Sequence, residues 1–289
     1  MSQATFTGAL GTGRVAGVHS CPRNSVRNQA RVRELELRLA ELRKDYADLD
    51  TALFEAAELH RRLCAPNLVR QGDFEIASEI FAVRHLPGDF FTVEEAGGGV
   101  VLALGDICGK GLSAGMWTPL LVGLVGMRTA ANADPQAIAT GVNHDLCGLS
   151  LVAPLASLFV IRLDPATRKL EYCSAGHPPA LLLRAGGQLE LLTDGGPLLG
   201  AVPTASFATG RVDLLAGDVL LVYSDGIVEA RNHGDEEFGR ARLEAELRRA
   251  PMGALDNVLF SILGAVRDFA TRELADDTSL VVVRRDPKR

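Results

Sequence analysis

The chain has 289 residues, a formal net charge of −6 and a pI near 5.6, so it lacks the basic excess of a nucleic-acid-binding protein. Hydrophobic residues make up 47% of it, enough to fill the core of one large domain with an appendage. Five scattered cysteines without a Cys-x-x-Cys pair favour a reducing compartment. The sequence shows no secretory signal or membrane-spanning run, and we predict a cytoplasmic protein without nucleic-acid or membrane partners.

The N-terminal part of the sequence predicts a flexible tail followed by a long helix. Residues 1–24 are rich in Gly and Thr, as mobile tails are. From Val32 to Leu63 apolar residues then recur with a strict 3-4 spacing, which is the seam of a coiled coil. We predict a helical linker over residues 25–65 that forms a homodimer through residues 25–63. The alternative is a long helix folded back on its own domain.

Two positions of this seam are poorly suited to a coiled coil. Tyr46 and His60 occupy a positions, where apolar aliphatic side chains pack best. They weaken the seam and mark places where it could be rearranged. The linker is therefore predicted to be regulatory, with input from a separate activator protein or from a rearrangement of the dimer.

Residues 66–289 read as one domain of short strands and covering helices. An alternating pattern predicts a strand over 74–84 and a hairpin over 90–106 with glycines at its turn. The remaining predicted strands cover 155–164, 169–176, 180–192, 208–226 and 279–285, and the predicted helices cover 111–131, 135–149 and two segments between 238 and 274. Many adjacent strands joined by short turns imply antiparallel sheets with helices on their faces.

Four aspartates stand where apolar strands begin or end: Asp89, Asp106, Asp225 and Asp276. One such residue is ordinary turn chemistry, and Asp225 before a glycine would by itself be read as a turn. Four of them, spread over nearly 190 residues, fit local turns poorly. They fit the coordination of a hard cation, whose oxygen ligands converge from separate strands. A cation would also compensate the charge of Asp106, which follows a strand that reads as buried.

Seven motifs occur in an order that resembles a known family: PGDFF, GDICGKG, SAGHPPALLL, GPLLG, AGDVLLVYSDGIVEARN, EEFG and DDTSLVVVR. The ordered set resembles the metal-dependent protein phosphatases (PPM, 2C-type), in the bacterial branch typified by SpoIIE and RsbU. The resemblance runs from Leu59 to Arg285. It implies an α+β fold, an α-β-β-α sandwich of two antiparallel sheets flanked by helices, with the long N-terminal helix in front.

The resemblance also implies a centre of two Mn²⁺ or Mg²⁺ ions. Asp106 would bridge the ions, and the backbone carbonyl of Ile107 would complete one site. Asp225 and Asp276 would hold the other ion, and Asp89 would serve the first, directly or through water. Asp106 and Asp225 are the predicted catalytic residues.

The sequence leaves some details of this assignment open at the DDTS motif, Thr92 and Cys108. The order of the DDTS motif leaves Asp277 as an alternative to Asp276. Thr92 stands where the family has a second acidic residue, which puts an auxiliary contact in doubt. Cys108 replaces the usual Ser, so no general acid is assigned. It is read as a small buried residue, with an oxidisable thiol close to the metals as the alternative. His177 is read as a turn-stabilising residue and not as a ligand.

The sequence therefore predicts a metal-dependent serine/threonine protein phosphatase that forms no phosphoenzyme. By resemblance, its substrate is a phosphorylated anti-sigma-factor antagonist of the STAS type in a partner-switching pathway. The alternative is a catalytically silent scaffold of the same fold that signals through its coiled coil. The complete set of four aspartates argues against the scaffold, which need not keep a costly carboxylate cluster.

Overall fold

The computed structural model describes residues 22–64, 69–71, 74–83, 86–149, 153–270 and 274–285. The chain divides into two units, residues 1–52 and 53–289. Most of the predicted tail lies outside the described residues, and its last three residues already belong to a helix. No helix in the described ranges combines the length and apolar character needed to cross a membrane.

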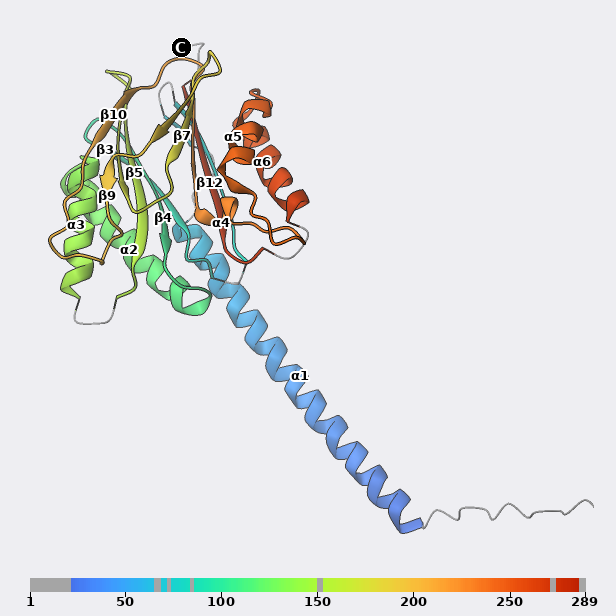
Figure 1. The fold of residues 1–289 in the computed structure, drawn as a ribbon. Helices are drawn as coiled ribbons and strands as arrows, with labels where there is room; N and C mark the ends of the chain where they lie inside the picture. The colour runs from blue at the N-terminus through green and yellow to red at the C-terminus, as the bar shows by residue number, and fades with distance from the viewer. Residues whose placement is uncertain are drawn as a thin grey trace, which may run out of the picture. The chain divides into compact units, whose positions relative to one another are not determined.

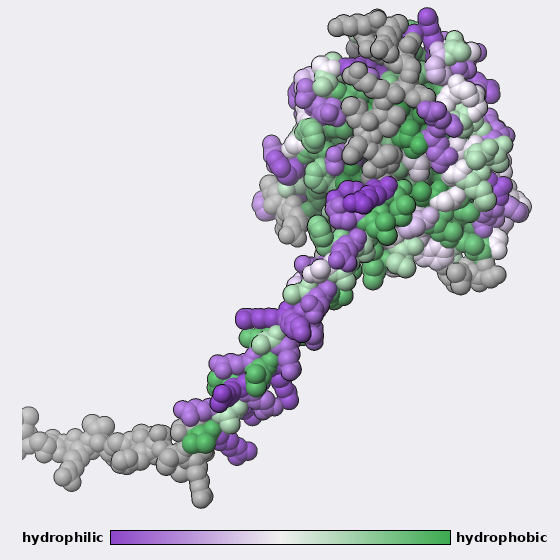
Figure 2. Space-filling model, turned by 180° about the vertical axis from the view of Figure 1, so that it is seen from behind, coloured by the Kyte–Doolittle hydropathy of each residue, from purple (hydrophilic) through white to green (hydrophobic). Residues whose placement is uncertain are grey.

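Helix α1 (Pro22–Cys64) confirms the predicted long helix. In the first unit the seam is open to solvent. Hydrophobic side chains are interspersed among hydrophilic ones along this part of the helix (Figure 2). The seam residues there are all at least 47% exposed: Val32, Leu35, Leu39, Leu42, Tyr46 and Leu49. Because solvent contact of such a stripe is unfavourable, the exposure supports a partner helix. The coiled coil itself stays a prediction.

The last turns of α1 belong to the second unit and behave differently at one seam position. His60 is only 5% exposed, and the backbone of Gly115 in helix α2 (Leu112–Ala131) lies beside its ring. Burial lowers the pKa of this imidazole. Here the chain's own domain covers the seam, as the alternative of a folded-back helix predicted, whereas Leu63 remains exposed.

Two six-stranded sheets form the centre of the second unit (Figure 1). Neighbouring strands are antiparallel in both, apart from the parallel pair β6–β9. The first sheet has the order β1 (Val69–Gln71), β2 (Phe74–Phe81), β12 (Thr278–Arg285), β11 (Val219–Tyr223), β7 (Ala180–Leu183), β8 (Leu189–Leu192). The second has the order β10 (Gly210–Asp213), β6 (Lys169–Ala175), β5 (Ala156–Asp164), β4 (Gly99–Ile107), β3 (Phe90–Ala96), with β9 (Gly195–Gly196) beside β6.

Helices cover the outer face of each sheet. Helices α2 and α3 (Pro135–Gly148) pack on the second sheet, and α5 (Gly239–Arg249) and α6 (Leu255–Phe269) pack on the first (Figure 1). A third apolar cluster fills the space between the sheets. The predicted α-β-β-α sandwich is confirmed. Its three apolar layers explain why strands such as β4 and β11 are buried along almost their whole length.

The predicted strand over 208–226 is in fact two strands in different sheets. Strand β10 ends the second sheet and β11 lies inside the first, so the chain crosses between the sheets at residues 214–218. Asp218 holds this crossing: its carboxylate accepts hydrogen bonds from the backbone N–H of Leu215 (3.0 Å) and Ala185 (3.0 Å). It also pairs with Arg184 at 2.8 Å. Alternation alone does not show such a crossing, because both strands are apolar.

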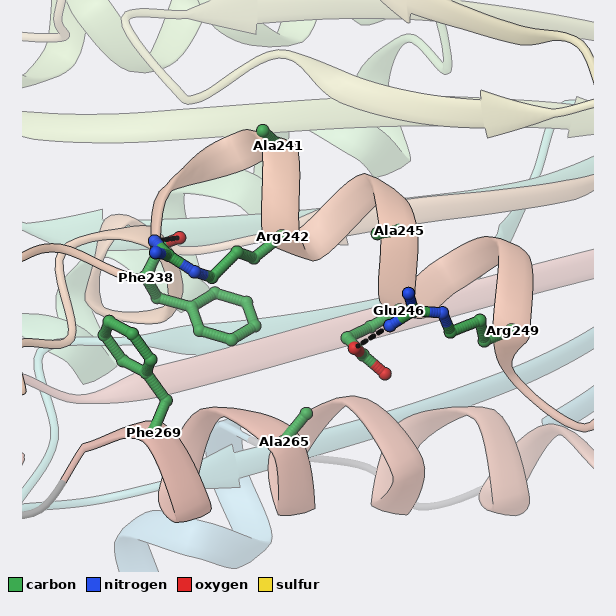
Figure 3. A pocket seen from close by; sticks show the side chains of 8 residues that line it. All are labelled: Phe238, Ala241, Arg242, Ala245, Glu246, Arg249, Ala265 and Phe269. Carbon is green, nitrogen blue, oxygen red and sulfur yellow. Dashed lines mark hydrogen bonds and ion pairs between the residues drawn. The ribbon is translucent and has the colours of Figure 1, made fainter.

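A groove of about 660 Å³ lies between α5 and α6 (Figure 3). The rings of Phe238 and Phe269 meet edge to face at 5.5 Å, and the guanidinium of Arg242 lies over Phe269 at 4.7 Å. None of the predicted site residues lines it. The groove therefore belongs to the packing of the outer helices and not to the aspartate site.

Candidate metal centre

Antiparallel pairing brings the four aspartates to one end of the sandwich. In the second sheet Asp89 precedes β3 and Asp106 lies near the end of β4, and the start of β3 pairs with the end of β4. In the first sheet Asp225 follows β11 and opens the short helix α4 (Asp225–Val228), while Asp276 precedes β12. The end of β11 pairs with the start of β12. Each sheet thus contributes two carboxyl groups.

The carboxyl groups are close enough to affect one another's protonation. Burial, together with the negative charges of Asp225 and Asp276, raises the pKa of Asp106 to about 7, although a hydrogen bond with Asp89 acts in the opposite direction. Burial and then the charge of Asp276 also raise the pKa of Asp225. A concentration of buried negative charge is costly without a cation, so this electrostatic pattern fits a cation site.

Asp89 is the deepest member of the cluster, with only 1% of its surface exposed. The hydroxyl of Ser279 donates a hydrogen bond to it at 2.5 Å, and the hydroxyl of Ser224 accepts one from the N–H of Ser279 at 2.9 Å. Burial and then the charge of Asp106 raise the pKa of Asp89 well above its usual range. Asp89 reaches the cluster through its hydrogen bond with Asp106. The sequence motifs do not single out either serine, although Ser279 lies inside the DDTS motif.

The two aspartates of the DDTS motif have different surroundings. The carboxylate of Asp277 accepts hydrogen bonds from the backbone N–H of Val83 (2.8 Å) and Gly88 (2.9 Å), one on each oxygen. The carboxylate of Asp276 instead pairs with the ammonium group of Lys110 at 2.6 Å and is about a third exposed. Both oxygens of Asp277 are thus held by backbone groups of distant residues. In Asp276, Oδ2 is held by a flexible lysine side chain, and Oδ1 accepts a hydrogen bond from the N–H of Asp277 at 3.1 Å. This supports the assignment of Asp276 as ligand, which stays a proposal.

Whether these residues fit a divalent ion can be judged from the oxygens they present. No three His, Cys, Asp or Glu side chains of the described ranges already surround one point closely enough to hold an ion. The backbone at Gly88 comes close to two of these oxygens: a Cβ there would lie 3.2 Å from the carbonyl oxygen of Ile107 and 3.3 Å from Oδ1 of Asp106, closer than an ordinary contact. The two oxygens thus lie near each other beside Gly88, and a set of carboxylates plus a carbonyl suits Mn²⁺ or Mg²⁺. The donor chemistry fits, and small rotations of the carboxylates would have to complete the coordination.

The prediction that Cys108 is buried is wrong. It directly follows β4, and its side chain is exposed at the same end as the aspartates. Partial desolvation of the sulfur and then the charges of Asp106 and Asp225 raise the pKa of its thiol. The cluster therefore disfavours a reactive thiolate here.

His177 lies in the core and not in the cluster. Its ring packs edge to face on Phe159 at 5.9 Å, and Nδ1 lies 3.2 Å from the carbonyl oxygen of Pro178. Burial lowers the pKa of this imidazole from 6.5 to about 4. These contacts agree with a structural role.

We expect the burial of His177 to make the folding stability depend on pH. Between about pH 6.5 and 4 the unfolded chain binds a proton at this position that the folded chain does not, so the free energy of unfolding falls as the pH falls. The loss at pH 4 is about 3 kcal/mol. Urea unfolding of the unmodified protein and of His177→Gln across this range checks it, since the variant should lose this part of the slope. Parallel profiles would contradict the prediction.

Comparison with known proteins places the chain in a family. Residues 96–286 match the family model described as Stage II sporulation protein E (SpoIIE). This match covers well over half of the chain. The chain belongs to the SpoIIE family.

Relatives of this SpoIIE-family chain include named bacterial proteins. It is 27% identical to protein IcfG of Synechocystis over 188 residues, which cover 55% of the chain and 30% of IcfG. It is 20% identical to the phosphoserine phosphatase RsbU of Bacillus subtilis over 234 residues, which cover 80% of the chain and 69% of RsbU. The chain thus spans less than a third of IcfG and somewhat over two thirds of RsbU.

Solved structures show the same fold. The SiaA-PP2C domain of Pseudomonas aeruginosa superposes with a TM-score of 0.73 at 18% identity, over 83% of this chain and 98% of that domain. A SpoIIE structure from Bacillus subtilis, comprising its PP2C phosphatase domain and a fragment of its regulatory domain, gives a TM-score of 0.62 at 20% identity over 76% of this chain and 65% of that one. At these identities the similarity establishes the fold, and the fold of the SpoIIE-family chain is that of PP2C domains.

Proposed function

We propose that this SpoIIE-family chain is a Mn²⁺- or Mg²⁺-dependent serine/threonine protein phosphatase. The main support for the proposal is that four aspartates at strand ends, two in each sheet, lie at the same end of a PP2C fold. Two of its relatives, RsbU and RsbP, are named phosphoserine phosphatases, which supports the same chemistry.

The proposed ligands are Asp106 with the carbonyl of Ile107, Asp225, Asp276 and, directly or through water, the buried Asp89. Two bound divalent ions would supply positive charge for the phosphoryl oxygens and lower the pKa of the attacking water. The chain's own residues prepare the site: Ile107 is fully buried with its carbonyl oxygen close to Gly88, and Ser279 holds Asp89 in place. Gly88 leaves room beside Asp106.

Phosphate release from a phosphoserine protein, measured with Mn²⁺ and with excess chelator, tests this proposal. We expect release with the metal and none with the chelator. Binding of Mn²⁺ is measured on the same preparation by calorimetry. A protein that neither binds Mn²⁺ nor releases phosphate would contradict the proposal and favour the silent scaffold.

For the substrate we propose a phosphorylated anti-sigma-factor antagonist of the STAS type, acted on in the cytoplasm within a partner-switching pathway. The relationship to RsbU and RsbP supports this class. The test compares dephosphorylation of the STAS protein encoded nearest to this gene with that of an unrelated phosphoprotein. Equal rates would contradict this substrate without touching the phosphatase chemistry.

We further propose that residues 25–63 form a homodimer whose rearrangement, or a separate activator, regulates residues 66–289. Leu42→Asp is expected to convert the dimer to a monomer, because it places a charge in the seam of α1. The matched control is Leu37→Asp, equally exposed but on another face of the helix. Light scattering checks both. A dimer that survives Leu42→Asp, or one that both variants disrupt, would contradict the proposed seam.

A further inference from the structure

Lys110 connects the two sheets at the aspartate end. It lies in the turn between β4 and α2, between Gly109 (φ 133°) and Gly111 (φ 72°). Its ammonium group lies 2.6 Å from Oδ2 of Asp276 and 3.1 Å from the carbonyl oxygen of Ala275, just before β12. The side chain is half exposed. A residue of the second sheet's loop thus covers a carboxylate of the first.

The ammonium group acts on several carboxyl groups of the cluster. Its positive charge counteracts the rise in the pKa of Asp225, of Asp277 and of Glu229. Lys110 also lines a pocket of about 230 Å³ together with Gly226, Glu229, Arg231 and Asp276. The side chain therefore has both a charge partner and open space next to it.

The ammonium group of Lys110 would compete with a divalent ion for the carboxylate of Asp276, because both are positively charged. An ion held by Asp276 would repel the ammonium group and weaken its hold on this carboxylate. A phosphoryl group beside the ion is doubly negative and attracts that group, since lysine binds phosphate as a point charge. The flexible four-carbon stem of lysine allows it to move between the two partners.

We propose that Lys110 is a phosphate-positioning residue: its ammonium group, held at the edge of the cluster by Asp276, turns to the phosphoryl oxygens of a bound phosphate. This inference rests on the proposed phosphatase function. It assigns to Lys110 two opposite effects, because the same ammonium group competes with the metal and attracts the phosphate. A purely structural lysine would have neither pattern.

The test compares Lys110→Met and Lys110→Arg with the unmodified full chain by calorimetry. Lys110→Met is expected to bind Mn²⁺ more tightly in the absence of phosphate. With Mn²⁺ bound it should bind inorganic phosphate about tenfold more weakly. Its KM for a phosphoserine protein should rise by a similar factor, with a smaller change in kcat. Lys110→Arg keeps the charge and should largely restore phosphate binding.

Arg231→Met is the matched control, since Arg231 lines the same pocket but pairs with Asp235 and Glu237. It should change neither affinity. Unchanged phosphate binding in Lys110→Met, or weaker Mn²⁺ binding in that variant, would overturn the inference while leaving the phosphatase proposal intact. If the unmodified protein binds no Mn²⁺, the proposed function fails and this inference fails with it.

Discussion

Asp225→Asn is expected to reduce Mn²⁺-dependent phosphate release on the order of a thousandfold. Asn is almost the same size as Asp but is neutral. The cluster would therefore lose a negative charge that interacts with both Asp106 and Asp276. The effect should fall on metal binding as well as on turnover. Phosphate release at saturating substrate and Mn²⁺ calorimetry measure the two separately.

A stability measurement distinguishes this loss from unfolding. Without metal, Asp225→Asn should unfold at the same temperature as the unmodified protein or higher, because it removes a charge whose neighbours repel it. The stabilisation that Mn²⁺ gives the unmodified protein should disappear. Asp235→Asn is the control, because Asp235 lines the neighbouring pocket with a 78% exposed side chain. Full activity in Asp225→Asn would remove Asp225 from the proposed centre.

Asp218→Ala is expected to lower the free energy of unfolding by about 3–5 kcal/mol. Asp218 is only 2% exposed, and its carboxylate satisfies two backbone N–H groups and the guanidinium of Arg184 at the crossing between the sheets. Alanine leaves these donors without their acceptor in a mostly desolvated place. Urea unfolding, with the slope compared between variants, gives the change.

The matched control for Asp218 is Glu190→Ala, which removes the other partner of the same arginine. Glu190 holds Arg184 through two hydrogen bonds of 2.8 and 2.9 Å, but its side chain is 34% exposed. Water can replace it, so we expect a loss of about 1 kcal/mol or less. Equal losses in the two variants would show that burial of Asp218 is not the source of its effect.

These two predictions concern aspartates of one motif, AGDVLLVYSDG, that differ only in their tertiary surroundings. Asp218 precedes β11 and Asp225 follows it, so they lie at opposite ends of the same strand. One meets Arg184, and the other meets two carboxyl groups, Asp106 of the second sheet and Asp276 of the first. No local pattern distinguishes them, because each is an aspartate next to a buried strand.

The order of strands and helices was predictable because alternation and helical spacing are properties of each segment by itself. Four candidate ligands could be identified for the same reason, because they lie at the ends of predicted strands: Asp89, Asp106, Asp225 and Asp276. The ordered motifs indicated the family. Which side chains face the cluster depends on distant parts of the chain. Asp277 is bound by backbone N–H groups 194 and 189 residues away in sequence.

The sequence by itself thus determined the layers, the candidate ligands and the exposed seam of α1. Only the tertiary structure decided that Cys108 is exposed, that His60 is buried and that Lys110 pairs with Asp276. Each of these three features depends on which side chain or backbone group of another segment lies within a few ångströms. Burial and hydrogen bonding result from contacts between distant segments, so the pattern of a single strand or helix does not predict them.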